Sequence, residues 1–436
     1  MAYPHEIRDP IHVFIRLDDA EREILNSRPL QRLRQVHQLA MTYLVYPSAT
    51  HMRFEHSLGV LELATRLFDV ITDPSNLGTA AGQFRELADQ DVRTYWRRVI
   101  RMAALCHDVG HLPFSHAAED VLLPPGHNHE MISAALIASS DMADIFKSVT
   151  PPLRPEDVLK IAVGPAKAKG ATFTSWQILL SDLITGEAFG ADRMDYLLRD
   201  SYHAGVGYGK FDHYRLIDTL RILVGPSVGG EADAEAALGV NAGGVRSAEA
   251  LLLARQFMYS EVYFHPVRLI YDLHLQDFLK TWLPGSVFPI DPDEHLKLTD
   301  NEVNVAISWA ARDSTAPGHD PAVRIVEHRH FKVLYERSQA DVKQNRDSGS
   351  AIATAAAAEF GADNVRHARK TDVGGAVIFP VEERDGRIAS SIEVSEVLQK
   401  LPAFTREYVF IEPGLRPAAQ QWLNKNRGDI IKPKES

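Results

Sequence analysis

The chain has 436 residues, of which 45% are hydrophobic and 24% charged, and its formal net charge is −11 at pH 7. This length suggests two or three domains, and the composition is typical of a globular protein. The acidic balance argues against an extended nucleic-acid surface but allows a nucleotide, whose phosphates need only a local group of cations. No signal peptide or membrane span is visible, and the single cysteine, Cys106, fits a reducing compartment, so we expect a cytoplasmic protein.

The first segments predict a hairpin followed by two helices. Residues 6–17 alternate apolar and polar side chains, which is typical of a short hairpin. Capping residues predict helices over residues 20–26 and 29–38. The second helix carries side chains that pair with phosphates and bases, although an ordinary solvated face is an equal alternative: Gln31, Arg32, Arg34 and Gln38.

The stretch at residues 46–60 is predicted to be a loop that leads into a helix, which continues to about Ile71. His56 lies on the first turn of this helix, where it could serve as a metal ligand. Arg53, just ahead of it, could contact a phosphate. Taken alone, a histidine at such a position is more often a hydrogen-bonded core residue.

The most informative stretch is an apolar helix that brings His107 and Asp108 side by side at its C-terminal end, before Gly110 stops it. A neutral imidazole and a carboxylate form a mixed nitrogen and oxygen pair that suits a divalent metal. His111 is predicted one turn beyond His107 on the same face, and His116 comes shortly after it. The His-Asp pair alone would more often be a helix cap, so a metal site requires further ligands from other helices of the chain.

Further candidate groups come after this helix. His129 begins another helix, and residues 149–175, rich in proline and glycine, are predicted to be a mobile connection. A later helix carries Asp192, Tyr196 and Asp200 on one face. This face extends about 12 Å at ~1.5 Å per residue, close to the reach from a phosphate to the sugar of a nucleotide.

The remaining chain predicts a long helix and then a smaller lobe. Residues 224–244 are predicted to be a loop with a short strand or helix, and residues 246–282 a helix that carries Arg255 and Tyr263 and is kinked at Pro266. Beyond it we expect helices at 299–311 and 337–365 and short α/β segments at 323–326, 331–335, 374–381, 391–394 and 408–411. The fold class is therefore mainly α: a helical domain at residues 1–283 and a C-terminal α/β lobe at residues 284–436.

His56, His107-Asp108 and Asp192 occur in the order H…HD…D on three predicted helices. This order resembles the HD-domain metal phosphohydrolases. The surrounding motifs resemble the deoxynucleoside triphosphate triphosphohydrolase branch of that family over roughly residues 5–280. They are Asp9-Pro10-Ile11-His12, Gln31-Arg32-Leu33-Arg34, Arg53-Phe54-Glu55-His56-Ser57-Leu58-Gly59, Gly110-His111, Pro113-Phe114-Ser115-His116 and Asp195-Tyr196…Arg199-Asp200. The resemblance implies an HD-domain helical bundle.

The resemblance also implies roles for individual residues. The metal ligands would be His56, His107, Asp108 and Asp192, and the ion Mn, Fe, Mg, Ni or Zn. The catalytic set would be Asp192 with His116, the acid at the leaving sugar oxygen, and His111 and His129 beside the phosphates. The substrate contacts would be Gln38, Leu39, Arg53, Arg193, Tyr196, Asp200, Arg255 and Tyr263. A possible activator site would include Asn26, Gln31, Arg32 and Arg34.

The activity that the resemblance implies is hydrolysis of deoxynucleoside triphosphates to deoxynucleoside and inorganic triphosphate, in a homodimer or homotetramer with a possible nucleotide activator. Asn26, Arg193 and Pro266 depart from the family's usual residues, so activation by a nucleotide is open. Two alternatives remain: another HD-domain enzyme, either a nuclease or a phosphatase of a different nucleotide, and a sensor that binds nucleotides without hydrolysing them.

Overall fold

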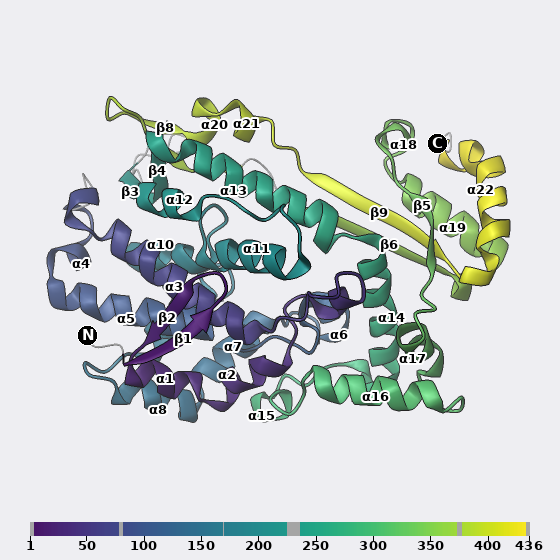
Figure 1. Cartoon of the computed structure of the whole chain (residues 1–436), viewed down its shortest axis with the longest axis horizontal. Helices are drawn as coiled ribbons and strands as arrows, with labels where there is room; N and C mark the ends of the chain where they lie inside the picture. The colour runs from purple at the N-terminus through teal and green to yellow at the C-terminus, as the bar shows by residue number, and fades with distance from the viewer. Residues whose placement is uncertain (1–3, 78–81, 169, 225–235, 373–376, 433–436) are drawn as a thin grey trace.

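The computed structural model describes residues 4–77, 82–168, 170–224, 236–372 and 377–432. The protein is mainly helical, as predicted. Most helices form one bundle, and a smaller lobe of strands and helices projects from one end of it (Figure 1). Among the described residues, no helix is both long and apolar enough to cross a membrane.

The elements follow one another in three groups. The N-terminal group consists of β1 His5–Asp9, β2 Val13–Leu17, α1 Asp19–Leu25, α2 Arg28–Arg32, α3 Arg53–Ile71, α4 Arg85–Ala88, α5 Gln90–Cys106, α6 Glu119–Leu122, α7 His129–Ile137, α8 Ser140–Ser148, α9 Pro155–Val163, α10 Ser175–Thr185, α11 Ala191–Ala204 and α12 His213–Thr219. The middle group consists of β3 Leu220–Val224, β4 Ala236–Asn241, α13 Val245–Met258, a π-helical turn at Tyr259–Tyr263 and α14 Pro266–Trp282. The C-terminal group consists of α15 Pro292–His295, α16 Asp300–Arg312, α17 His319–Val326, β5 Lys332–Glu336, α18 Gln339–Gln344, α19 Ser348–Phe360, β6 Val365–Asp372, β7 Pro380–Glu382, β8 Ile388–Ser390, α20 Ser391–Val394, α21 Glu396–Gln399, β9 Phe404–Ile411 and α22 Arg416–Ile431.

Several predicted elements are confirmed. The N-terminal hairpin pairs Ile7 with Ile15, and α1 begins with a capping box formed by Asp18 and Glu21. The long helix predicted at 246–282 is present but interrupted, and α14 begins at Pro266, whose missing N–H is tolerated in the first turn of a helix.

Other predictions are wrong in detail. The segment 149–175 is not simply a connection, because α9 lies within it between its proline- and glycine-rich ends. The helix predicted through Gln38 is α-helical only to Arg32 and then tightens into a 3-10 turn. By contrast, the short strand or helix predicted within residues 224–244 is present as the strand β4; residues 225–235, like residues 374–376, lie outside the described residues.

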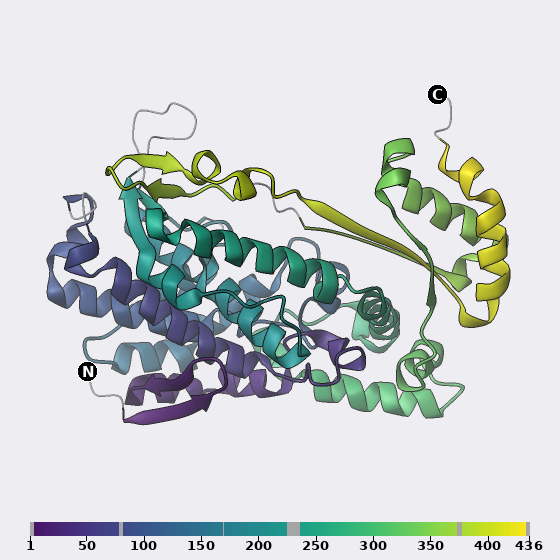
Figure 2. The same ribbon diagram turned by 45° about the horizontal axis from the view of Figure 1, so that its top comes forward.

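Two sheets connect the C-terminal part of the chain to the bundle in different ways. The strand order β3-β4-β7-β8 includes a parallel pair between β4 and β7, so residues near 380 return to the helical bundle. The order β5-β9-β6 forms the projecting lobe, whose long strands β6 and β9 extend from the bundle toward α19 and α22 (Figure 2). Residues beyond 283 therefore contribute to both parts, and the division into residues 1–283 and 284–436 stays a prediction.

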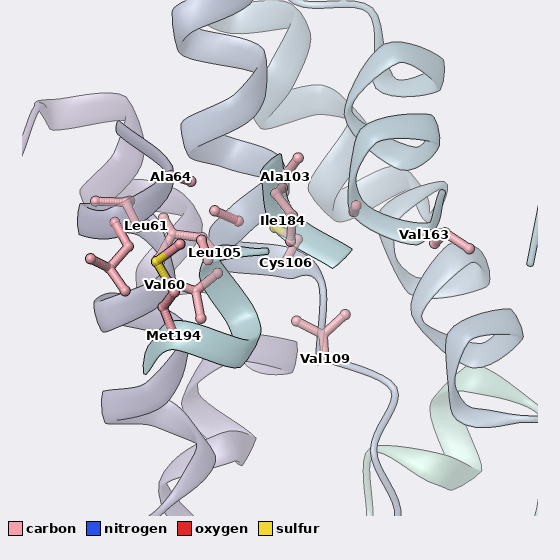
Figure 3. Packing of buried hydrophobic residues seen from close by; sticks show 14 of the residues in the cluster. Val60, Leu61, Ala64, Ala103, Leu105, Cys106, Val109, Val163, Ile184 and Met194 are labelled. Atoms are coloured by element: carbon pink, nitrogen blue, oxygen red, sulfur yellow. The ribbon is translucent and has the colours of Figure 1, made fainter. Parts of the chain in front are cut away.

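The apolar core lies where α3, α5, α9, α10 and α11 meet. Figure 3 shows side chains from all five helices packed together: Val60, Leu61, Ala64, Ala103, Leu105, Cys106, Val109, Val163, Ile184 and Met194. Cys106 is fully buried in this cluster, and burial raises the pKa of its thiol, so it is a core residue and not a nucleophile. This core holds the ends of α3, α5 and α11 in fixed relation, and those ends carry the candidate site.

The contact between α3 and α11 requires a glycine. A Cβ atom built on Gly59 of α3 would lie 1.9 Å from Oδ1 of Asp195 and 2.4 Å from Nη2 of Arg199, both on α11. These two side chains form a completely buried ion pair with Nε–Oδ2 at 2.8 Å. The absence of a side chain at position 59 therefore makes room for a buried charged network between the two helices.

We predict that Gly59→Ala destabilises the protein by roughly 2–4 kcal/mol, because the added methyl group must displace a buried ion pair. Thermal or denaturant unfolding of the two proteins measures this difference. Gly428→Ala is the matched control, since Gly428 also lies within a helix and an added Cβ there meets nothing within 4 Å. Equal unfolding free energies for wild type and Gly59→Ala would contradict the prediction.

Candidate metal and phosphate site

The four residues of the H…HD…D pattern converge at one place, from α3, the end of α5 and the start of α11. Nε2 of His56 lies 3.0 Å from Oδ1 of Asp192, and Nε2 of His107 lies 3.7 Å from the same oxygen. Asp108 completes the group, with its carboxylate oxygens 3.6 Å from Nε2 of His56 and 3.3 Å from Nε2 of His107. One donor atom each of His56, His107 and Asp192 lie within 4.8 Å of one another, so a single ion could contact all three.

Both histidines have their other ring nitrogen held by an acceptor. Nδ1 of His56 lies 2.8 Å from Oδ2 of Asp195, and Nδ1 of His107 lies 2.8 Å from the carbonyl oxygen of Ala104, in the last turn of α5. An Nδ1–H that donates to such an acceptor leaves the Nε2 lone pair for a metal. Nε2 of His107 is buried without a hydrogen-bond partner. These observations fit a divalent ion bound by His56, His107, Asp108 and Asp192.

The prediction that α5 continues past His107 is wrong in detail. The helix ends at Cys106, and His107 is its C-terminal cap. His111 is therefore not one turn further along the same helix, although its Nε2 still lies 3.4 Å from Oδ1 of Asp108. The turn beyond Cys106, not a continuous helix, aims the two imidazoles at the same carboxylate.

The negative charge at this centre favours a cation. Burial alone would lower the pKa of His56, but hydrogen bonds to Asp192 and Asp195 outweigh it and raise the pKa to about 10. Burial opposes the charge of Asp192, yet His107 and His56 hold the pKa of that carboxyl well below its usual range. Two carboxylates that remain ionised beside two imidazoles form a position that a divalent ion can occupy in place of a proton.

A second group of histidines lies beside this centre: His111, His116 and His129, together with Glu119. Nδ1 of His129 and Nδ1 of His116 lie 2.7 and 2.9 Å from the two oxygens of Glu119. Burial opposes the charge of His129, but its hydrogen bond to Glu119 outweighs burial and raises the pKa of His129. Burial also opposes the charge of Glu119, but the hydrogen bonds from His116 and His129 hold its pKa far below the usual range. Glu119 therefore favours the protonated form of His129.

The ring geometry argues against a metal ion within this second group. The rings of His111 and His129 are stacked with centroids 3.8 Å apart and planes inclined by 19°. A metal binds in the plane of an imidazole, and two nearly parallel planes do not meet within bonding distance. This group is better suited to contact anions and to move a proton.

A strained loop presents His116 to the site. Phe114 and Ser115 both have φ of +56°, a conformation that costs non-glycine residues about 1–3 kcal/mol each. The backbone N–H of Phe114 donates to Asp300 at 2.6 Å, and the Ser115 hydroxyl donates to the carbonyl of His37. Arg53 donates to the Ser115 hydroxyl and to Asp108, so the loop and the metal centre are tied together.

A cavity of about 700 Å³ opens beside both groups. Most of the predicted site residues line it: Gln38, Leu39, Arg53, His107, Asp108, His111, His116, His129, Asp192, Tyr196, Asp200 and Tyr263. His56 lies behind them, fully buried. On one wall, Asp200 accepts from the hydroxyl of Tyr263 at 2.7 Å and is held on its other oxygen by Nε2 of His51, also at 2.7 Å.

Two predicted substrate contacts are absent from the described lining of this cavity. Arg193 donates to the carbonyls of Gly186 and Glu187, and Arg255 pairs with Asp372 at 3.1 Å. Both guanidinium groups are engaged within the protein, where they hold neighbouring segments of chain.

The predicted activator positions are divided between surface and interior. Asn26 and Arg34 are exposed, and Gln31 is half-buried with its amide donating to the carbonyl of Leu25. Arg32, by contrast, is buried and donates to the carbonyls of Leu298 and His111, so the prediction that it faces an activator is not supported by its position. Its role here is to fasten the loop that carries His111.

Several residues of the site were missed by sequence reasoning. Asp195 holds His56, Glu119 holds His116 and His129, and further polar side chains line the cavity: Glu130, Lys167, Asp182, Glu187, Arg268, Asp272, Gln276 and Lys370. The spacing in the sequence could have indicated two of them. Asp195 comes three residues after Asp192, and Glu119 comes three residues after His116, so each lies close to a residue that was predicted for the site. Lys370 comes from β6 of the projecting lobe, and nothing local to its sequence indicates this position.

Comparison with known proteins agrees with this geometry. The model of the HD domain matches residues 53–200, and that of the HD associated region matches residues 211–366. A solved structure of a hypothetical protein from Aquifex aeolicus is 31% identical, covers 96% of this chain and 99% of its own, and superposes with a TM-score of 0.76. The chain belongs to the HD-domain family, which confirms the predicted resemblance.

Two further relatives differ in what is known of them. An uncharacterized protein of Methanocaldococcus jannaschii is 35% identical over 266 residues, or 61% of this chain and 47% of that protein. The human deoxynucleoside triphosphate triphosphohydrolase SAMHD1 is 29% identical over 367 residues, or 76% of this chain and 54% of that protein. The chain thus spans about half the length of these relatives.

We predict that His107→Ala lowers the affinity for Mn²⁺ at least tenfold, because it removes a nitrogen ligand whose second nitrogen is already held in place. Equilibrium dialysis followed by elemental analysis gives the bound ion per chain. His330→Ala, which changes a half-buried histidine outside the cavity lining, is the control and should bind the ion as wild type does. Undiminished binding in His107→Ala would refute the metal assignment.

Proposed function

We propose that the protein is a divalent-metal-dependent phosphohydrolase that converts deoxynucleoside triphosphates to deoxynucleoside and inorganic triphosphate. The observation that carries this proposal is the convergence of His56, His107, Asp108 and Asp192 beside a cavity with a histidine cluster and a wall of sugar-binding character. The relationship to enzymes named deoxynucleoside triphosphate triphosphohydrolases supports the choice of substrate.

The proposed metal ligands are His56, His107, Asp108 and Asp192. A bound divalent ion supplies charge neutralisation at phosphoryl oxygens and lowers the pKa of a water molecule. Asp195 acts from behind, by holding His56 in the orientation that the ligand set requires.

The phosphates would lie along the basic and imidazole side of the cavity. Arg53 is fixed by Asp108 and Ser115 and still lines the cavity, where its guanidinium can neutralise phosphate charge. His129, whose pKa is raised by its hydrogen bond to Glu119, can donate to a phosphate oxygen. Lys167 also lines the cavity, where it is paired with Glu130 at 2.9 Å. His111 is buried against Asp108 and His129, and burial together with Arg53 and His129 lowers its pKa, so it contacts phosphate as a neutral donor.

His116 is the proposed general acid. Its Nδ1 donates to Glu119, and 60% of its side-chain surface is exposed, so Nε2 can reach a bound substrate. Water attacks the α-phosphorus, the bond from that phosphorus to the 5′ oxygen breaks, and His116 gives its proton to the departing oxygen. Burial lowers the pKa of His116, and the hydrogen bond to Glu119 opposes this shift and so favours the protonated form that the transfer requires.

The sugar would pack against the opposite wall. Asp200 and Tyr263, joined by a hydrogen bond, are placed to bind the 3′-hydroxyl, with Tyr196 beside them. Gln38 and Leu39 line the same cavity, and the apolar side chain of Leu39 offers no hydrogen bond to a 2′-hydroxyl that would lose its hydration beside it. This arrangement accounts for a preference for deoxynucleotides. A nucleotide activator and a dimer or tetramer remain part of the proposal through the relatives alone.

We predict that the purified protein with Mn²⁺ releases deoxynucleoside and triphosphate from at least one of the four deoxynucleoside triphosphates, alone or mixed. Anion-exchange chromatography identifies the products. His107→Ala and Asp108→Ala should abolish turnover while circular dichroism stays unchanged. Release of monophosphate or diphosphate would mean that water attacks another phosphorus; no turnover with metal bound would favour the nuclease or the nucleotide sensor.

We predict that His116→Ala lowers kcat by about 10²–10⁴-fold with little change in substrate affinity, because the variant lacks the proton donor but keeps the phosphate contacts. Single-turnover kinetics and equilibrium binding separate the two effects. His127→Ala, a nearby histidine outside the cavity lining, should retain full activity. An unchanged kcat in His116→Ala would assign the proton transfer to another group.

A further inference from the structure

One wall of the cavity is a polar stripe on α14 that the proposed reaction does not use. Arg268, Asp272 and Gln276 are four residues apart, so they project from the same face of the helix, and all three line the cavity. Leu269 and Leu273 line it beside them and add an apolar surface. We call these five residues the α14 wall.

The polar groups of the α14 wall are incompletely paired. Asp272 is 7% exposed, and its Oδ1 is buried without a hydrogen-bond partner. Its Oδ2 lies 3.5 Å from Nη2 of Arg268, which is a loose ion pair, and Nε of Arg268 is also unpartnered. A buried carboxylate oxygen without a donor is costly, so a ligand that brings N–H groups to it gains binding energy.

The wall adjoins both ends of the proposed sugar site. Arg268 donates to the backbone carbonyl of Tyr263, and the hydroxyl of Tyr263 donates to Asp200. Gln276 donates to the carbonyl of Ala117, the residue that follows His116. A nucleoside held between Tyr263 and His116 would therefore direct its base toward Asp272. Lys370 of β6 lines the same cavity, and β6 packs against α14.

The charges of the wall favour a base over a phosphate. A phosphate would meet Arg268 and Lys370, but the carboxylate of Asp272 would repel it. A nucleobase that offers an acceptor to the guanidinium and neighbouring N–H donors to the carboxylate satisfies both groups, while Leu269 and Leu273 can contact the ring face. Guanine has this edge, since its O6 accepts and its N1–H and 2-amino group donate side by side.

We propose that Asp272 and Arg268 read the base of the nucleotide and select guanine. This inference rests on the proposed function and specifies its substrate. The carboxylate of Asp272 accepts from N1–H and the 2-amino group, and Arg268 donates to O6. Adenine, cytosine and thymine each lack the paired donors and would leave Oδ1 of Asp272 unsatisfied. A site with buried polar groups binds such ligands much more weakly than a ligand that pairs with those groups.

The test compares Asp272→Asn with wild type in the full-length protein. Asparagine keeps the shape of the side chain but replaces one acceptor by a donor. Equilibrium dialysis with deoxyguanosine, deoxyadenosine, deoxycytidine and thymidine measures base binding without hydrolysis, and kcat/KM for the four triphosphates measures its use. Asp277→Asn is the control, because Asp277 is on the same helix but pairs with Arg366 and is absent from the cavity lining.

We expect wild type to bind deoxyguanosine most tightly, and Asp272→Asn to weaken that binding by about 10- to 100-fold while changing the other three little. The kcat/KM for dGTP should fall in parallel, and Asp277→Asn should match wild type. No preference for guanine in wild type, or an equal loss for all four bases in Asp272→Asn, overturns the base assignment. Selective binding of deoxyguanosine that Asp272→Asn removes, without hydrolysis of any triphosphate by wild type, would keep the base assignment and reject the proposed function.

Discussion

The buried carboxylate of Asp195 is the interaction on which the candidate site depends. It accepts from Nε2 of His12, from Nδ1 of His56 and from the guanidinium of Arg199, and Arg199 in turn reaches Asp9. These groups come from the N-terminal hairpin, α3 and α11, and α11 follows the other two by more than a hundred residues in the sequence. Burial opposes the charge of Asp195, but Arg199 and the two histidines hold its pKa well below its usual range.

A network of this kind contributes specificity more than net stability. A buried ion pair gains little over an apolar pair of the same shape, but removing one partner leaves an unpaired charge and costs about 3–5 kcal/mol. The network therefore tolerates only one mutual arrangement of α3 and α11. That arrangement brings His56 within 3.0 Å of Asp192 and so assembles two ligands of the metal centre. Gly59 belongs to the same constraint, because a larger residue would occupy the space of the ion pair.

How much could be predicted from the sequence depended on how local the signal was. The helices Arg53–Ile71 and Ala191–Ala204 have clear apolar periodicity, and Pro266 marks the start of α14. The helix Pro155–Val163 was missed because prolines and glycines surround it, although a proline in the first turn is a common helix start. The parallel pairing of β4 with β7 joins Val240 to Val381, and no local pattern indicates so distant a contact.

The site shows the same division between local and distant signals. His107 and Asp108 are adjacent, so the metal pair could be predicted directly. Lys370 reaches the cavity only because β6 folds back beside α14, and its sequence neighbours gave no indication of this. Arg32 was predicted as a possible activator contact from its residue type and from the family resemblance. In the structure it is buried and donates to two carbonyl oxygens, so a contact with an activator stays a prediction. The residue types in the sequence indicated which side chains could bind a metal or a phosphate. The tertiary contacts determined which of those side chains lie in the cavity.

The two ends of the cavity differ in a way that bears on the reaction. The metal centre and the histidine cluster can bind and activate many phosphate esters, so this end alone does not define a product. Under the proposed function, the walls formed by Asp200, Tyr263 and α14 would fix where the sugar and base lie, and hence which phosphorus comes next to the metal ligands. His116 belongs to the histidine cluster, with its ring centroid 4.6 Å from that of His111 and 5.1 Å from that of His129. On this proposal, a proton donor there would serve the oxygen that joins sugar to triphosphate, and the spacing of the walls, more than the metal chemistry, would direct cleavage to the α-phosphorus.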